Sequence, residues 1–147
     1  MSTTRSIRFQ EFFPHPVERV WAALTEPSAI AKWLMDNDFV PEVGRTFTLR
    51  AERVPFRPDG TIPCRVVECD PPTTLAYTWA SDSWIVCYRL EPAEVDGVAG
   101  TRLHFEHSGF DLDNPRDAFA YDKMGRGWRS MGPDLARVLD ELAASSA

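Results

Sequence analysis

Residues 114–142 read NPRDAFAYDKMGRGWRSMGPDLARVLDEL, and this stretch decides the fold. Asn114 followed by Pro115 is typical of a helix N-cap and the first helical residue. Apolar and small residues then recur three and four positions apart, which predicts an amphipathic helix lying on an apolar layer. The inward stripe comprises Ala118, Tyr121, Gly125, Trp128, Gly132, Leu135, Leu139 and Leu142, flanked by Met124, Met131 and Val138.

Two glycines and a proline make this helix unusual. Gly125 and Gly132 fall on the inward stripe, although glycine inside a helix costs about 1 kcal/mol relative to alanine. They indicate either a close backbone approach or free space. Pro133 lacks a backbone donor and would clash with the carbonyl of Arg129. We therefore expect one helix kinked at Pro133 or two helices that meet near Gly132.

Size and composition indicate one ordinary globular domain over residues 1–147. The chain has 44% hydrophobic and 26% charged residues and a net charge of −6. It contains no concentrated run of Lys and Arg of the kind that binds phosphate backbones. Nucleic acid is therefore excluded as an expected partner.

Location can be inferred only from what the sequence lacks. Residues 1–8 have no apolar signal-peptide core, and no stretch approaches 18 consecutive apolar residues. Cys64, Cys69 and Cys87 are odd in number and have no CxxC spacing, as expected for reduced thiols. We expect a cytoplasmic protein without membrane insertion.

Six segments before the long helix alternate with the period of two that is typical of strands. They are residues 7–13, 46–51, 62–69, 75–80, 84–90 and 103–107. Pro16 and Pro27 each open a short helix between residues 16 and 35. Turns are expected at residues 57–60, 70–72, 81–83 and 95–100, and a loop at residues 36–44.

The resulting order is β-α-α-β-β-β-β-β-α, an α+β protein. Five consecutive strands with short turns form an antiparallel meander, and the first strand has its shortest connection beside the last. This predicts a curved antiparallel sheet of about six strands around the long C-terminal helix, with a cavity at the open end.

Residues 16–27, PVERVWAALTEP, followed by Trp33, resemble the opening of a known family. Residues 67–72, 75–79, 101–103, 107–110 and the Gly127-Trp128 pair fit the same family, so the resemblance covers about residues 6–142. The family is the C-terminal-domain type of homologues of the activator of heat-shock protein 90 ATPase.

This resemblance implies the helix-grip fold of the START-like (SRPBCC), birch-pollen-allergen-like superfamily. Members bind lipids, sterols or polyketides, and some are cyclases or hydrolases. The eukaryotic activator contacts a chaperone, so the resemblance also implies chaperone contact and a link to the stress response.

The chemistry-bearing side chains are few. His104 and His107 lie three apart on a strand and so face opposite sides, where they cannot bind one metal together. The sequence also has no HExxH motif and no Gly-rich phosphate loop, so we expect neither a metal nor a cofactor. Glu11 and His107 are the weak catalytic candidates, because pairing of the first and last strands could bring them together inside the cavity. The alternative is a polar pair without catalysis.

Inward aromatic residues suggest a lined cavity rather than a catalytic apparatus. Each ring taken alone could equally be ordinary core. Tyr77 and Tyr88 could orient a ligand with their hydroxyls, and Phe110 and Tyr121 are expected at the entrance. The predicted ligand-binding set is Trp79, Trp84, Tyr77, Tyr88, Phe105, His107, Phe110, Tyr121, Gly125, Trp128 and Gly132.

The sequence thus favours a binder of a small hydrophobic or aromatic molecule. A chaperone-associated interaction module is the second hypothesis, and an enzyme using Glu11 and His107 is the third. A charged edge strand at residues 47–54, with Arg50, Glu52 and Arg53, favours a monomer or a weak homodimer.

Overall fold

The computed structural model describes residues 4–51 and 59–145, so the expected turn at 57–60 and the end of the expected edge strand at 47–54 lie partly outside the described residues. The elements in chain order are β1 (Thr4–Phe13), α1 (Val17–Thr25), α2 (Pro27–Trp33), β2 (Asp36–Asn37), β3 (Thr46–Arg50), β4 (Thr61–Asp70), β5 (Thr74–Trp79), β6 (Ser81–Val95), β7 (Val98–Asp111), α3 (Pro115–Trp128) and α4 (Met131–Ser145).

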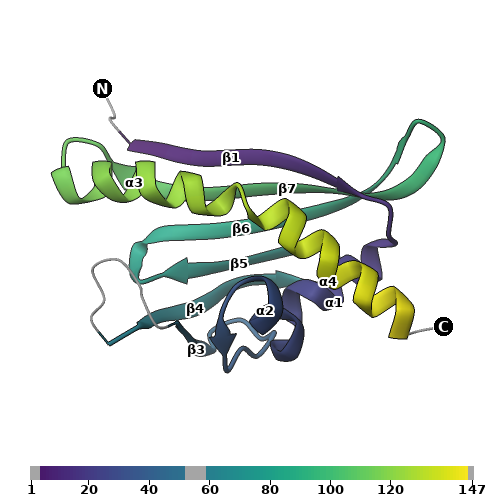
Figure 1. Cartoon of the computed structure of the whole chain (residues 1–147). Coiled ribbons are helices and arrows are strands. Elements are labelled where there is room, and N and C mark those ends of the chain that lie inside the picture. Colours follow the sequence, from purple (N-terminus) through teal and green to yellow (C-terminus); the bar gives the residue numbers. More distant parts are fainter. Residues whose placement is uncertain (1–3, 52–58, 146–147) are drawn as a thin grey trace.

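One antiparallel sheet runs in the order β1-β7-β6-β5-β4-β3-β2 (Figure 1). The first strand pairs with the last, as predicted. The sheet has seven strands rather than six because residues 36–37, expected in a loop, pair with β3. A two-residue strand carries no alternating pattern from which it could be recognised.

The two short helices form at the predicted place and lie over the same face of the sheet as the C-terminal segment (Figure 1). Val20 and Leu24 of α1 are buried, as are Ile30 and Trp33 of α2. The Trp33 indole N–H donates to the Ala23 carbonyl at 2.8 Å, so the two helices are joined by a buried hydrogen bond.

The C-terminal segment is two helices, which resolves the alternative left open by the sequence. Arg129 and Ser130 separate α3 from α4, so the break precedes Gly132. Pro133 falls in the first turn of α4, where its missing N–H costs little. The Asn114 side chain accepts from the Arg116 N–H at 2.9 Å and caps α3 as expected.

The two helices cover different parts of the sheet. α3 lies against β1 and β7, whereas α4 crosses diagonally toward α1 and α2 (Figure 1). α3 buries Ala120 rather than Ala118, together with Trp128. A curved antiparallel sheet with a long C-terminal helical segment is the helix-grip arrangement. No helix in the described part of the chain has the length and apolarity needed to cross a membrane.

The β5–β6 connection is tighter than expected. Residues 81–83, predicted as a turn, belong to β6, and the turn is made by Ala80 with φ of 67°. By contrast, Asp96 and Gly97 both have positive φ and connect β6 to β7 in the predicted hairpin.

Candidate ligand pocket

An open pocket of about 730 Å³ lies between α2, α3 and the β5–β6 turn. Its volume is within the range of roughly 300–1,000 Å³ that is usual for small-molecule sites. Its inner wall is mostly aromatic and aliphatic, and its rim is polar. The apolar lining residues include Trp33, Met35, Ile62, Trp79, Trp84, Ala120, Met124 and Trp128. The polar lining residues include Asn114, Arg116, Asp117, Lys123 and Asp134.

Three tryptophans from three different elements form the aromatic part of this wall. Trp79 ends β5, Trp84 lies near the start of β6, and Trp128 ends α3. The Trp79 and Trp128 rings meet edge to face with centroids 5.2 Å apart, and both side chains are buried. Trp84 is only half-buried. These are the three members of the predicted ligand-binding set that line the pocket.

His107 lies directly behind these tryptophans and is fully buried. The Trp128 indole N–H donates to His107 Nδ1 at 3.0 Å, so the neutral imidazole carries its proton on Nε2. Nε2 has no hydrogen-bond partner among the described residues. Burial lowers the pKa of His107 to about 3, which keeps the ring uncharged at neutral pH.

Tyr77 and Tyr88 lie in the core and do not line the pocket. Their hydroxyls hydrogen-bond to each other at 2.7 Å, and the Tyr88 ring meets the Trp33 ring edge to face. Burial raises the pKa of both phenols. Their hydroxyls are therefore engaged with each other in this structure rather than directed at the pocket.

Phe110 does not stand at an entrance, contrary to the expectation from sequence. It is fully buried and packs between Trp84 and Tyr121, at centroid distances of 5.0 and 5.5 Å. The long β7 carries Phe110 inward before the chain turns into α3. Phe105 is also core, 4.6 Å from the Trp128 ring.

The inward glycines serve different purposes. A Cβ at Gly125 would touch only Ile7, at 4.0 Å, whereas a Cβ at Gly132 would lie 2.7 Å from Glu11 Oε1. Neither glycine lines the pocket. Gly127 does line it, and a Cβ there would meet nothing within 4 Å. The sequence feature that could have pointed to Gly127 is its position two residues after Gly125.

The structure does not bring Glu11 and His107 together. His107 lies opposite Ile7, while Glu11 lies opposite Leu103, four residues farther along β1. At about 3.3 Å per residue this separates the two positions by roughly 13 Å. Glu11 instead lies beside the first turn of α4, where a carboxylate is favoured by the helix dipole.

Sequence reasoning missed the rim and the contribution of α2. The helical pattern puts Arg116 and Lys123 on the face opposite the inward stripe, yet both line the pocket together with Asp117. Trp33 and Met35 also line the pocket, although neither is in the predicted ligand-binding set. The run of three large apolar residues Trp33-Leu34-Met35 at the end of α2 is the sequence feature that could have indicated this part of the pocket.

The family comparison agrees with this fold. The family model described as Activator of Hsp90 ATPase homolog 1-like protein matches residues 14–140. The chain belongs to this family. No curated protein sequence matches it.

Several solved structures share the fold of this family member. A Mesorhizobium loti protein is 34% identical with a TM-score of 0.79, over 93% of this chain and 98% of that one. A Bacillus halodurans protein is 28% identical with a TM-score of 0.75, over 95% and 99%. The Aha1 dimer from Colwellia psychrerythraea is 20% identical with a TM-score of 0.67, over 90% and 96%, and shares the fold.

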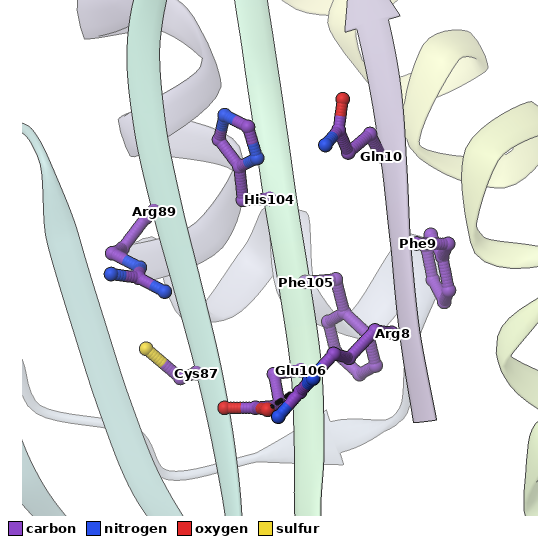
Figure 2. Close-up of a pocket in the computed structure, with 8 residues that line it drawn as sticks. All are labelled: Arg8, Phe9, Gln10, Cys87, Arg89, His104, Phe105 and Glu106. Carbon is purple, nitrogen blue, oxygen red and sulfur yellow. Dashed lines mark hydrogen bonds and ion pairs between the residues drawn. The ribbon is translucent and has the colours of Figure 1, made fainter. Parts of the chain in front are cut away.

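A second hollow, of about 510 Å³, lies on the outer face of β1, β7 and β6 (Figure 2). Three of its polar side chains, Arg8, Glu106 and His104, are already engaged in ion pairs or hydrogen bonds. The Arg8 guanidinium pairs with Glu106, and His104 Nε2 lies 2.8 Å from Glu91 Oε1. Burial raises the pKa of the Cys87 thiol, which leaves it a poor nucleophile. This hollow is therefore the weaker candidate.

Within residues 4–51 and 59–145, no three His, Cys, Asp or Glu side chains cluster so that they could hold a metal ion. The three histidines lie at separate positions, with His15 between Asp140 and Arg19.

Proposed function

We propose that this protein binds a small, largely apolar molecule in the pocket between α2, α3 and the β5–β6 turn. The observation that carries the proposal is the opening of about 730 Å³ walled by Trp79, Trp84 and Trp128. Aromatic walls favour apolar and aromatic ligands through area burial and ring stacking. The START-like resemblance points to the same class of function.

The polar rim suggests how such a ligand is oriented. Arg116 and Lys123 place positive charge at the mouth, and Asp117 and Asp134 place negative charge there. A few polar groups around an apolar wall fix orientation and provide specificity. The ligand would therefore hold its apolar body against the tryptophans and its polar end at the rim.

The first test is native mass spectrometry of freshly purified protein, followed by denaturing extraction. We expect a co-purifying molecule of a few hundred daltons, and the same spectra report whether the chain is a monomer or a homodimer. Gly127→Leu should fill the pocket and abolish this adduct, because a side chain there enters free space. Gly127→Ala is the matched control for helix propensity and should retain the ligand. An apo protein that also binds no apolar probe would remove the proposal.

The second candidate function is contact with a chaperone, and the family match is the observation that favours it. In the described part of the chain the exposed large apolar side chains are Val43, Val67, Val98 and Phe119, from four different segments. The test is the ATPase rate of purified Hsp90 with increasing amounts of this protein. A rise in rate supports this function, and an unchanged rate at excess protein removes it.

A further inference from the structure

Behind the tryptophan wall lies a buried hydrogen-bond donor that has no partner in the described part of the chain. The His107 imidazole is enclosed by Trp79, Trp84 and Trp128, with ring centroids 5.8, 6.1 and 6.0 Å away, and by Phe110 at 4.7 Å. The three tryptophans all line the pocket. The imidazole is therefore one ring removed from the pocket.

The tautomer of His107 follows from its one hydrogen bond. An indole N–H can only donate, so the contact with Trp128 Nε1 at 3.0 Å requires a lone pair on His107 Nδ1. The proton of the neutral ring is then on Nε2. That N–H is fully buried and has no acceptor among the described residues. A buried donor left unpaired costs free energy, which an acceptor brought by a ligand would recover.

We propose that the bound ligand carries an oxygen that accepts a hydrogen bond from His107 Nε2–H. This inference rests on the proposed pocket function and adds the ligand class. The ligand is an uncharged aromatic or aliphatic molecule with a ketone, ester, ether or hydroxyl oxygen toward its inner end.

The surroundings of His107 argue for an uncharged acceptor. Four aromatic rings surround it, and the cationic side chains of the pocket, Arg116 and Lys123, belong to the rim rather than to this inner wall. A carboxylate moved among aromatic rings loses its hydration without gaining a cationic partner. A carbonyl or hydroxyl oxygen loses far less.

Access to His107 requires one side chain to move, and Trp84 is the candidate. It is half-buried, whereas Trp79 and Trp128 are buried. Its backbone is held, because β7 passes so close that a Cβ on Gly109 would lie 1.8 Å from the Ser83 carbonyl oxygen. Rotation of the Trp84 indole on this fixed backbone would open the path from the pocket to the imidazole.

The test compares two probes that differ by one oxygen, acetylnaphthalene and ethylnaphthalene, by isothermal titration calorimetry. The wild-type protein should bind the ketone about tenfold more tightly, which corresponds to one net hydrogen bond. His107→Phe should remove this preference and retain binding of the hydrocarbon. His107→Gln should keep much of it, because its amide can accept from Trp128 and donate onward.

The outcomes separate this inference from the proposed function. If wild-type protein binds neither probe, both fail. If it binds both equally, the pocket function stands and the role of His107 is wrong. If His107→Phe still binds the ketone more tightly than the hydrocarbon, the role of His107 is also wrong, because another group then recognises the oxygen. If His107→Phe does not fold, proton–nitrogen spectra of the wild-type histidine rings decide: only the ketone should shift the His107 Nε2 resonance, and no shift overturns the inference.

Discussion

The two helices of the C-terminal segment have the same apolar spacing and different surroundings. α4 buries Met131, Leu135, Val138 and Leu139 over α1 and α2, whereas α3 buries only Ala120 and Trp128. α4 packs against α1 and α2, and its first turn lies against Glu11 of β1. α3 lies over the end of the sheet, where the β5–β6 turn and α2 leave a pocket. An amphipathic stripe thus predicts which residues face inward, but not whether other side chains pack against them or leave a pocket.

The largest expected difference between the halves is in core truncation. Leu135→Ala in α4 should lower the free energy of unfolding by about 2–5 kcal/mol, because Leu135 is fully buried and its removal leaves a cavity. Met124→Ala, at a half-buried position that lines the pocket, should cost less than about 1 kcal/mol. Urea denaturation measures both. Equal losses would show that the two helices are equally well packed.

The second-largest expected effect on stability comes from the hydrogen bond between Trp128, at the end of α3, and His107. Trp128→Phe retains aromatic packing but leaves His107 Nδ1 without its donor, so it should cost about 1–3 kcal/mol. Trp84→Phe is the matched control in the same aromatic wall, and should cost less because Trp84 is half-buried. Denaturation curves of the two variants give the loss in the free energy of unfolding for each. A larger loss for Trp84→Phe than for Trp128→Phe would contradict the role given to the Trp128 indole.

Stability should also depend on pH through His107. Its folded pKa of about 3 lies below the ordinary value of 6.5, so between these values the unfolded chain binds the proton more strongly. His107 therefore makes stability fall as pH falls from about 6.5 toward 3, by up to about 1.4 kcal/mol per pH unit. His107→Gln has no such group, so its stability difference from wild type should shrink on acidification. A constant difference between pH 7 and 4 would exclude this contribution.

The smallest effect concerns glycine in the two helices. Gly127→Ala in α3 should raise the free energy of unfolding by up to about 1 kcal/mol, because the methyl group enters free space and helix propensity improves. Gly132→Ala in α4 should give no such gain, because Glu11 must move. Adding Glu11→Ala should restore the gain at Gly132, and thermal unfolding of the double-mutant cycle measures it. Additive effects would show that Glu11 does not oppose the methyl group.

The fold could be predicted largely because period-two and helical patterns are local. Alternation placed each long strand, and the need for short connections put β1 beside β7. β2 could not be found, because two residues show no periodicity. Pro133 indicates that the last helix is interrupted, but not where. The break falls at Arg129 and Ser130, and its position depends on which turn best accommodates the missing N–H of Pro133.

The arrangement of the pocket was less accessible to sequence reasoning. Alternation correctly places Tyr77 and Tyr88 on the inner face, yet their mutual hydrogen bond depends on a diagonal relation between β5 and β6. Likewise, the pairing of β1 with β7 left the relative positions of Glu11 and His107 open until the register was known. Side-chain direction follows from pattern, whereas distance along the sheet follows from register.

The break between α3 and α4 has a consequence for how such a protein can diverge. In a continuous helix, any tilt or rotation of one end is transmitted to the other, so a change of ligand would disturb the anchoring core. Here Ser130 ends the first helix by donating to the Gly127 carbonyl, and its own carbonyl accepts from Asp134 in the second. The covering helix can therefore be remodelled while the anchor stays in place. Descendants of one ancestor can acquire new binding preferences without having to rebuild a stable scaffold.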